Sequence, residues 1–227
     1  MDIAIKEFFP ILSNSDLFCN MNKTELKATL SYFKAESQSY RKGDILVGTG
    51  EKMNKFGFVL KGSVQVVVDD INGDRVIMAN VSEGVTFGES LCYTGRVSGI
   101  YVVATTEALV MWLSCDNLLL GENPNPEAEA RFVRLLANRA LSMNDRIQVL
   151  SKKSLRAKLN AFFTQCLIQN NSTDFYLDMD RESMAAYLGI DRSALSRELS
   201  KMRAEGLIDF RKNHFCLLKA NLNGGNK

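Results

Sequence analysis

The sequence lacks the residue clusters that most metal and cofactor sites require. It has a single histidine, His214, and its cysteines form no CxxC pair or four-cysteine group. The five cysteines lie far apart in the chain: Cys19, Cys92, Cys115, Cys166 and Cys216. Zinc ribbons and iron–sulfur clusters need closely spaced Cys or His ligands. We therefore predict no metal site and no resident cofactor.

The default interpretation of the cysteines is that they are small apolar side chains in a protein of a reducing compartment. A thiol that senses oxidants is marked by its pKa and its exposure, and neither can be read from a sequence. A redox role for Cys19, Cys92 or Cys115 therefore stays open as an alternative.

Catalytic motifs and long apolar runs are absent as well. The chain has no Ser/His/Asp or Cys/His pairing within plausible reach and no phosphate-binding loop, so we expect no enzyme. No apolar run of roughly 18 residues occurs, and Met1-Asp2 does not begin a basic-then-apolar leader. We expect a cytoplasmic protein that does not contact membranes.

The net charge of +2 is distributed unevenly along the 227 residues. Residues 1–150 contain 15 Lys and Arg against 18 Asp and Glu, a balance of −3. Residues 151–227 contain 13 against 8, a balance of +5. Because binding to phosphates requires a basic surface, the C-terminal part is the candidate for contact with nucleic acid.

Short strands joined by turns are predicted between residues 43 and 121. Eleven of the fifteen glycines lie there, in a stretch rich in Val, Ile, Phe and Thr. Three segments have the strand pattern: 56–68, 75–81 and 99–113. Turn signals accompany them at Asn72-Gly73-Asp74, Glu83-Gly84 and Thr94-Gly95. This pattern indicates a β-barrel or jelly roll. The preceding forty residues have helical spacing, and we expect the turn at 41–44 to lead into the first strand.

A helix with a regular apolar stripe is predicted over residues 127–150, after Pro124 and Pro126. Its apolar residues recur at steps of three and four: Val133, Leu136, Ala140, Met143, Ile147 and Leu150. These are a and d positions of a heptad, and β-branched residues at a favour two strands. We therefore predict a homodimer through this helix. The alternative is a helix that packs on its own domain.

Two short amphipathic helices separated by a tight turn are predicted within residues 180–206. Asp180 is the expected N-cap of the first, Gly189-Ile190-Asp191 is the turn, and Gly206 ends the second. The apolar residues of each helix share one face: Met184, Ala185 and Leu188, then Leu195, Leu199 and Met202. The opposite face of the second helix carries only hydroxyls and cations: Arg192, Ser193, Ser196, Arg197, Ser200 and Lys201.

This arrangement is typical of a helix-turn-helix, in which the second helix offers a cationic face to the major groove. The alternative is an ordinary helical hairpin with a solvated basic face. Two following segments alternate as paired strands around residues 212–213, which predicts a wing with Arg211 and Lys212 near its tip. A helix over residues 155–166, after Ser151–Ser154, is expected to begin the same domain.

The order of these segments resembles the Crp/Fnr family of bacterial transcription regulators, over roughly residues 10–220. The motifs that carry the resemblance are Lys42-Gly43-Asp44, Val59–Val64, Phe87-Gly88-Glu89, Asp191–Arg197 and Glu205–Ile208. The implied fold is α+β with three parts. Residues 1–121 form a double-stranded β-helix (a jelly roll like a cyclic-nucleotide-binding domain) that senses an effector. Residues 127–150 form the dimerisation helix and residues 151–227 a winged helix-turn-helix.

The resemblance implies a homodimer that binds palindromic promoter sites on double-stranded DNA, with RNA polymerase as a further candidate partner. In the family, an effector in the β-roll shifts the DNA-binding domains. The competing hypothesis is a small-molecule or redox sensor whose winged helix contacts a protein instead of DNA.

The effector region departs from the pattern of the cyclic-AMP-binding members. Those members have a Gly-Glu pair, then Arg-Ser or Arg-Thr about ten residues later, and the Arg neutralises the cyclic phosphate. Gly88 and Glu89 are present here, but Ser98 and Gly99 stand where the Arg pair belongs. Arg96 lies two residues earlier, about 6–7 Å along an extended chain, so it substitutes only if the loop shifts. We predict an unidentified effector other than cyclic AMP, or Gly88-Glu89 retained simply as a turn.

The predicted recognition helix also departs from the family. Members that read a TGTGA half-site carry Arg-Glu early in the helix and a second Arg five residues after the first. This chain keeps Arg192 and Arg197 but has Ser193 in place of the acid. We therefore expect a different half-site, with Arg197 on guanine and with Arg192, Arg211 and Lys212 on phosphates. His214 is expected to face solvent or a phosphate rather than bind a metal.

Overall fold

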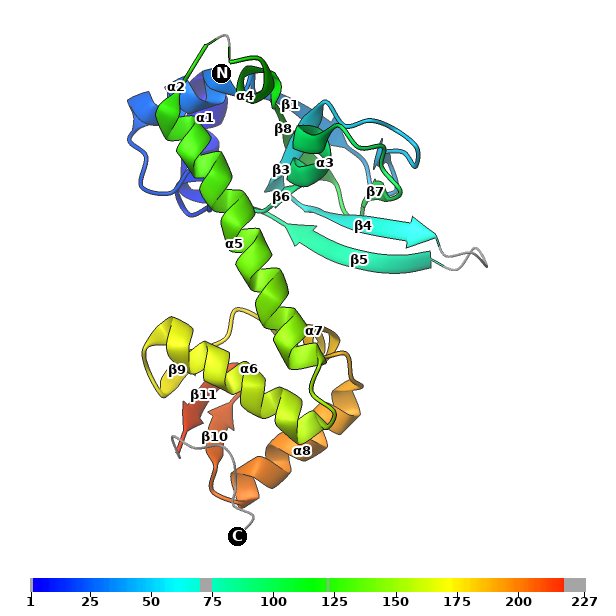
Figure 1. Cartoon of the computed structure of the whole chain (residues 1–227), viewed down its shortest axis with the longest axis vertical. Helices are drawn as coiled ribbons and strands as arrows, with labels where there is room; N and C mark the ends of the chain where they lie inside the picture. The colour runs from blue at the N-terminus through cyan, green and yellow to red at the C-terminus, as the bar shows by residue number, and fades with distance from the viewer. Residues whose placement is uncertain (1, 70–74, 122, 219–227) are drawn as a thin grey trace. The chain divides into compact units, whose positions relative to one another are not determined.

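The computed structural model describes residues 2–69, 75–121 and 123–218, and the chain divides into two compact units. The first unit comprises residues 1–138 and the second residues 139–227. The predicted turn Asn72-Gly73-Asp74 lies outside the described residues. Figure 1 shows the helices and strands of both units.

The first unit contains two four-stranded antiparallel sheets. One has the order β1-β8-β3-β6, with β1 Glu36–Tyr40, β8 Ala108–Ser114, β3 Lys55–Lys61 and β6 Thr86–Phe87. The other has the order β2-β7-β4-β5, with β2 Ile45–Val47, β7 Tyr101–Ala104, β4 Ser63–Asp69 and β5 Arg75–Ser82. Buried residues of both sheets, including Phe58 and Val64, belong to one hydrophobic cluster. This is the jelly-roll-like unit that the sequence predicts.

The strand boundaries differ from the predictions in two places. The turn at residues 41–44 follows β1, so it leads into the second strand rather than the first. The predicted strand 56–68 is broken at Gly62, which has a φ of 80° and joins β3 to β4. A Cβ at Gly62 would lie 2.2 Å from the carbonyl oxygen of Glu107, so only glycine fits this turn.

Five helices accompany these sheets: α1 Asp2–Ser13, α2 Lys23–Tyr32, α3 Glu89–Thr94, α4 Asp116–Leu120 and α5 Pro126–Leu150. Helix α2 begins at a capping box, in which the side chain of Asn22 accepts from the backbone of Glu25 and the Glu25 side chain accepts from the backbone of Asn22. Buried Leu26 and Leu30 of α2 join the core of the first unit. The helical spacing predicted for this region is confirmed.

The predicted long helix is present as α5, which begins one residue earlier than expected at Pro126. Proline suits this position because its missing N–H would have no partner inside the helix. Asn125, just before it, accepts from the N–H of Ala128. The division between the two units falls inside α5, so its two halves contribute to different cores.

Helix α5 has two apolar stripes. Ala128, Phe132 and Leu135 are buried in the core of the first unit. The predicted a/d stripe is instead exposed at Val133 (64%), Met143 (66%) and Ile147 (60%). The remaining members of that stripe differ: Ala140 and Leu150 are exposed, whereas Leu136 packs partly against the core of the first unit.

The second unit is a helical domain with a small sheet. Its elements are α6 Leu155–Asn170, β9 Asp174–Tyr176, α7 Arg181–Leu188, α8 Arg192–Ala204, β10 Ile208–Arg211 and β11 His214–Leu217. Its core holds the apolar faces of α6, α7 and α8 together with Val149 of α5. The sheet has the order β10-β11-β9, so the predicted two-stranded wing gains a third strand.

Candidate nucleic-acid interface

Helices α7 and α8 are joined by the tight turn that the sequence indicates. The carboxylate of Asp180 accepts from the N–H of Ser183 at 2.8 Å and caps α7. Gly189 ends α7 with a φ of 62°, a left-handed conformation that glycine adopts without strain, and α8 begins after Asp191. Leu195, Leu199 and Met202 are fully buried. Their burial fixes which face of α8 remains in solvent.

That solvent face contains all six of the predicted recognition residues. Each is exposed: Arg192, Ser193, Ser196, Arg197, Ser200 and Lys201. The Ser196 hydroxyl donates to the carbonyl oxygen of Arg192 at 3.0 Å, and the Ser200 hydroxyl to that of Ser196 at 2.9 Å. A hydroxyl used in this way still has acceptor lone pairs. These serines can therefore accept hydrogen bonds from a ligand without rearrangement of the helix.

Two acids in and just after α8 form ion pairs with an arginine that the sequence analysis did not single out. Arg156 of α6 forms ion pairs with Glu198 in α8 and with Glu205 just after α8. The Nη2 of the same guanidinium donates to the other carboxylate oxygen of Glu205 at 3.1 Å. These hydrogen bonds raise the pKa of Arg156 and lower the pKa of Glu205. Because its internal acid is engaged by α6, α8 presents cations and hydroxyls on its exposed face.

The wing is joined to α7 by a second arginine missed at the sequence level. The guanidinium of Arg181 lies 5.2 Å from the ring centre of Phe210 and 5.1 Å from that of Phe215. It also donates to the carbonyl oxygen of Lys212 at 3.0 Å. Desolvation, and then the charge of Arg192, lower the pKa of Arg181. Arg211 and Lys212 are exposed beside this anchored turn, where Lys212 has a φ of 56°.

His214 is partly exposed in the wing, where the sequence predicts a residue that faces solvent or a phosphate. Its Nε2 lies 2.6 Å from a carboxylate oxygen of Asp174, and its ring stacks on Tyr176 with ring centres 4.4 Å apart. Both partners lie in β9, the strand that the sequence analysis missed. A three-residue strand carries too little periodicity to be recognised before its pairing with β11 is known.

The predicted effector residues of the first unit differ in their burial. Glu89 (7% exposed) and Ser98 (1%) are buried, whereas Arg96 and Gly99 are exposed. The carboxylate of Glu89 accepts from the hydroxyl of Thr86. The hydroxyl of Ser98 donates to the carbonyl oxygen of Ile100 at 2.7 Å. Ser98 therefore helps to hold its own loop.

Gly88 is required where it stands, as the left-handed residue before α3. It has a φ of 81°, and a Cβ there would lie 2.2 Å from the terminal methyl of Met53. The pair Gly88-Glu89 therefore has a structural role as the start of a helix, which refines the expectation of a simple turn.

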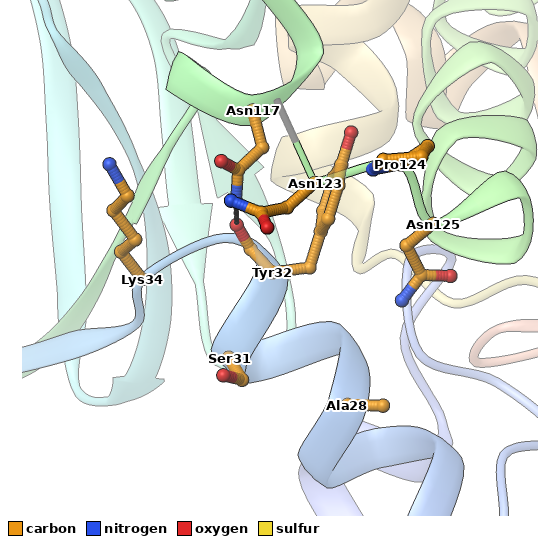
Figure 2. Close-up of a pocket in the computed structure, with 8 residues that line it drawn as sticks. All are labelled: Ala28, Ser31, Tyr32, Lys34, Asn117, Asn123, Pro124 and Asn125. Carbon is orange, nitrogen blue, oxygen red and sulfur yellow. Dashed lines mark hydrogen bonds between the residues drawn. The ribbon is translucent and has the colours of Figure 1, made fainter. Parts of the chain in front are cut away.

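A separate pocket of about 610 Å³ lies between α2, α4 and residues 123–125, which precede α5 (Figure 2). The side chain of buried Asn117 donates to the carbonyl oxygen of Tyr32 at 2.5 Å, as the dashed line in Figure 2 marks. The Tyr32 hydroxyl in turn donates to Glu129 in the first turn of α5 at 3.0 Å. None of the predicted effector residues lines this cavity.

Residues 2–69, 75–121 and 123–218 contain no group of three or more His, Cys, Asp or Glu side chains placed to hold a metal ion. Within the same ranges, none of the helices combines the length and the apolar character needed to cross a bilayer.

Comparison with family models assigns both units. Residues 37–119 match the model of the cyclic nucleotide-binding domain, and residues 157–221 match the Crp-like helix-turn-helix domain. The first match covers the sheets of the first unit, and the second covers most of α6 together with α7, α8 and the wing.

Curated relatives match most of the chain. The cAMP-activated global transcriptional regulator CRP of Salmonella typhimurium is 21% identical over 195 residues, which are 83% of this chain and 93% of the relative. The transcriptional activator protein FnrL of Cereibacter sphaeroides is 23% identical over 200 residues, 84% of this chain and 79% of the relative.

Solved structures show the same fold. The catabolite activator protein of Thermus thermophilus superposes with a TM-score of 0.53 and 21% identity, covering 89% of this chain and 93% of that one. A CooA mutant from Carboxydothermus hydrogenoformans gives a TM-score of 0.59 and 18% identity, covering 83% and 86%.

Proposed function

We propose that this chain, which belongs to the Crp/Fnr family of DNA-binding transcriptional regulators, acts as a homodimer on palindromic promoter sites and responds to an effector other than cyclic AMP. The observation that carries the proposal is the exposed face of α8, whose six residues are cations or hydroxyls. A helix with this face suits the major groove of DNA.

Within the interface, α8 reads bases and the wing holds phosphates. Arg197 contacts guanine, because a guanidinium can donate two parallel hydrogen bonds to that base. Ser193 and Ser196 adjust the preference at neighbouring bases, while Ser200 and Lys201 extend the same face. Arg192, Arg211 and Lys212 neutralise phosphates. Anchoring of the Lys212 carbonyl by Arg181 supports this role, because it fixes the wing turn relative to α7.

The dimer forms through the exposed stripe of α5. Val133, Met143 and Ile147 are more than half exposed in the single chain, which is unusual for residues of their size at regular spacing. Pairing of two copies would bury this stripe and give two recognition helices, as a palindromic site requires. RNA polymerase is the further partner at a promoter, and transcription in vitro with purified polymerase tests that contact.

Cyclic AMP is not the effector in this proposal. Its phosphate needs a cation at the position that Ser98 occupies, and the Ser98 hydroxyl is already used by the backbone of Ile100. Arg96 is exposed on the same loop. The effector therefore has a different chemistry from that of a cyclic nucleotide, or it acts elsewhere in the first unit.

Selection of random duplexes by the purified protein, followed by a salt titration of the complex, tests the function. The expected result is an enriched inverted repeat and a nonspecific affinity that falls steeply with salt, because phosphate contacts release counterions. Absence of an enriched repeat together with a flat salt dependence would favour the alternative, a winged helix that contacts a protein partner.

A further inference from the structure

The pocket between α2, α4 and residues 123–125, called the α2–α4 pocket below, is large enough for a small ligand. Its volume of about 610 Å³ lies within the range of about 300–1,000 Å³ that is usual for small-molecule sites. All of its lining residues belong to the first unit. The polar ones come from the three segments around the pocket in Figure 2: Ser31, Lys34, Asn117, Asn123 and Asn125.

Asn117 of α4 is the buried polar residue of this pocket. It is 8% exposed, and its Nδ2 donates to the carbonyl oxygen of Tyr32 at 2.5 Å, which fixes the amide in place. Its Oδ1 has no hydrogen-bond partner among the described residues. Because an unpaired acceptor in a largely buried residue costs free energy, a ligand that donates a hydrogen bond to Oδ1 is favoured.

The amides of Asn123 and Asn125 and the hydroxyl of Ser31 add further donors and acceptors. Asn125 uses its Oδ1 to accept from the N–H of Ala128, which leaves its Nδ2 as a donor for a ligand. Within the described ranges, the side chains of Asn123 and Ser31 have no hydrogen-bond partner. An amide can both donate and accept, and so can a hydroxyl. The α2–α4 pocket therefore suits a ligand that does both.

The charges of the lining disfavour an ionic ligand. Among the described residues of the lining, only Lys34 is charged. Its ammonium pairs with the carboxylate of Asp116 at 3.0 Å, and this hydrogen bond lowers the pKa of Asp116. An anion would compete with Asp116 for the ammonium, and a cation would meet no acid among these lining residues. Because removal of a charge from water without a partner is costly, an uncharged ligand fits best.

Apolar groups complete the lining. Ala28 and Pro124 line the pocket, and so does Tyr32, which is 6% exposed. A sugar ring presents hydroxyl groups at its edge and C–H groups on its faces. It can therefore contact the amides and the apolar groups of this pocket at the same time.

The residues of the pocket also hold the first turn of α5. The Tyr32 hydroxyl donates to Glu129 at 3.0 Å, and the N–H of Asn125 donates to the same carboxylate oxygen at 3.2 Å. Burial, and then the hydrogen bond to Glu129, raise the pKa of Tyr32 to about 12, so the hydroxyl keeps the proton that it donates. Val133, the first residue of the exposed α5 stripe, follows Glu129 by about one helical turn. A ligand that moves residues 123–125 would therefore shift the start of the proposed dimer helix.

We propose that the α2–α4 pocket binds an uncharged polyhydroxylated ligand such as a monosaccharide, and that this ligand is an effector that acts through residues 123–125 on the first turn of α5. The binding half stands on the lining of the pocket. The regulatory half rests on the proposed dimeric DNA-binding function.

Calorimetry with sugars that differ in charge tests the binding half. D-glucose, D-galactose and D-ribose are titrated into the full-length protein, followed by D-glucuronate and D-glucosamine, which carry a negative and a positive charge. We expect saturable binding of at least one uncharged sugar and about tenfold weaker binding of both charged ones, equivalent to about 1.4 kcal/mol. Equal or tighter binding of either charged sugar would overturn the proposed ligand class. Failure of all three uncharged sugars to bind at millimolar concentration would overturn the proposal.

Substitutions around the pocket locate the site. Ser31 and Thr24 are both exposed on α2, but of the two only Ser31 lines the pocket. Ser31→Arg places a long charged side chain across the pocket and should abolish sugar binding, whereas Thr24→Arg is the matched control that should retain it. Asn123→Ala, at an exposed position outside the helices, should weaken binding and leave the fold intact. Sugar binding that is unchanged in folded Ser31→Arg, or in Asn123→Ala if the first variant fails to fold, would overturn the assignment of the site.

Operator binding with and without the sugar tests the regulatory half. We expect a saturating sugar to change operator affinity about tenfold in the wild type and in Thr24→Arg, which is a usual size for coupling between two sites. No change is expected in Ser31→Arg. A sugar that binds but alters neither the operator affinity nor the dimer fraction would overturn its role as an effector. Failure of the protein to bind DNA in either condition would count against the proposed function alone, because the calorimetry does not depend on DNA.

Discussion

At the scale of single residues, the cations of the second unit have two different surroundings. Arg156, Arg181 and Arg203 contact acids or aromatic rings of their own unit and so stabilise the fold. Arg197 and Lys201 of α8 stand in solvent, as do Arg211 and Lys212 of the wing. Function is expected to reside in this second group, because these side chains are exposed to solvent. Arg197 also donates to the carbonyl oxygen of Ser193 in its own helix at 3.4 Å.

Substitution of Arg197 should change sequence preference. Arg197→Ala is expected to cost about 1–3 kcal/mol at the specific site and to relax discrimination at one base pair. Lys212→Ala, the matched cation of the wing, should weaken all sequences alike and reduce the salt slope by about one unit. Fluorescence anisotropy on a set of single-base operator variants measures both effects. If Lys212→Ala alters base preference and Arg197→Ala does not, the wing is the reader.

Cyclic AMP should bind weakly or not at all, with a dissociation constant far above the micromolar range. Loss of the charge-assisted contact to the phosphate costs several kcal/mol, and each 1.4 kcal/mol is about tenfold in affinity. Isothermal titration calorimetry of the purified protein measures this directly. Micromolar binding would contradict the prediction, and its loss in Arg96→Ala would then identify Arg96 as the replacement cation.

At the scale of elements, the apolar spacing in the sequence predicts the helices and their buried faces. It does not predict the ion pairs that join one element to another. Leu195, Leu199 and Met202 define the buried face of α8 by spacing alone, and the structure confirms it. The link from Arg156 to Glu205 joins residues 49 positions apart, and no local pattern indicates such a pair. The sequence of residues 88–99 departs from the cyclic-AMP-binding pattern, but the burial of Ser98 depends on the folded loop.

The pairing of α6 with α8 should make stability depend on pH. The hydrogen bond from Arg156 holds the pKa of Glu205 below its ordinary value of 4.5. A carboxylate with a lowered pKa stabilises the fold above its ordinary pKa, and this stabilisation is lost as the pH falls through the folded value. Arg156→Met should therefore lower the free energy of unfolding near neutral pH and flatten its decline below about pH 4.5.

Urea unfolding followed by circular dichroism across that range measures the effect. Arg197→Ala removes a solvent-exposed arginine from α8 and should leave the pH profile unchanged. An equal flattening in both variants would mean that net charge, rather than the pair, sets the slope.

Substitution on the exposed stripe of α5 should separate the dimer. Ile147→Asp places a charge in the proposed interface and is expected to yield monomers and to weaken operator binding. Leu141→Asp is the matched control, because Leu141 is equally exposed (62%) on the same helix but lies outside the a/d stripe. Leu136 is a poorer choice, since it also packs on the first unit. Sedimentation velocity gives the mass, and a dimer that survives Ile147→Asp would locate the interface elsewhere.

At the scale of the whole chain, the basic excess and the DNA-binding helices lie in the same segment. The balance of −3 in residues 1–150 and +5 in residues 151–227 gives the DNA-binding part the attraction for phosphates. The acidic balance of residues 1–150 should limit nonspecific attachment of that part of the chain to DNA. The sequence predicted this division and the order of the parts, because both depend on composition and local periodicity.

The ion pairs of Arg156 also bear on how such a regulator diversifies. They hold α8 from the side turned away from its exposed face, and the buried stripe of α8 holds it from within. Positions 193, 196 and 200 are therefore free of structural duties beyond their own helix. A library randomised at these three sites should retain its folded fraction while its preferred operators spread widely. Lineages carrying this scaffold could acquire new target promoters by few substitutions, without passing through unstable intermediates.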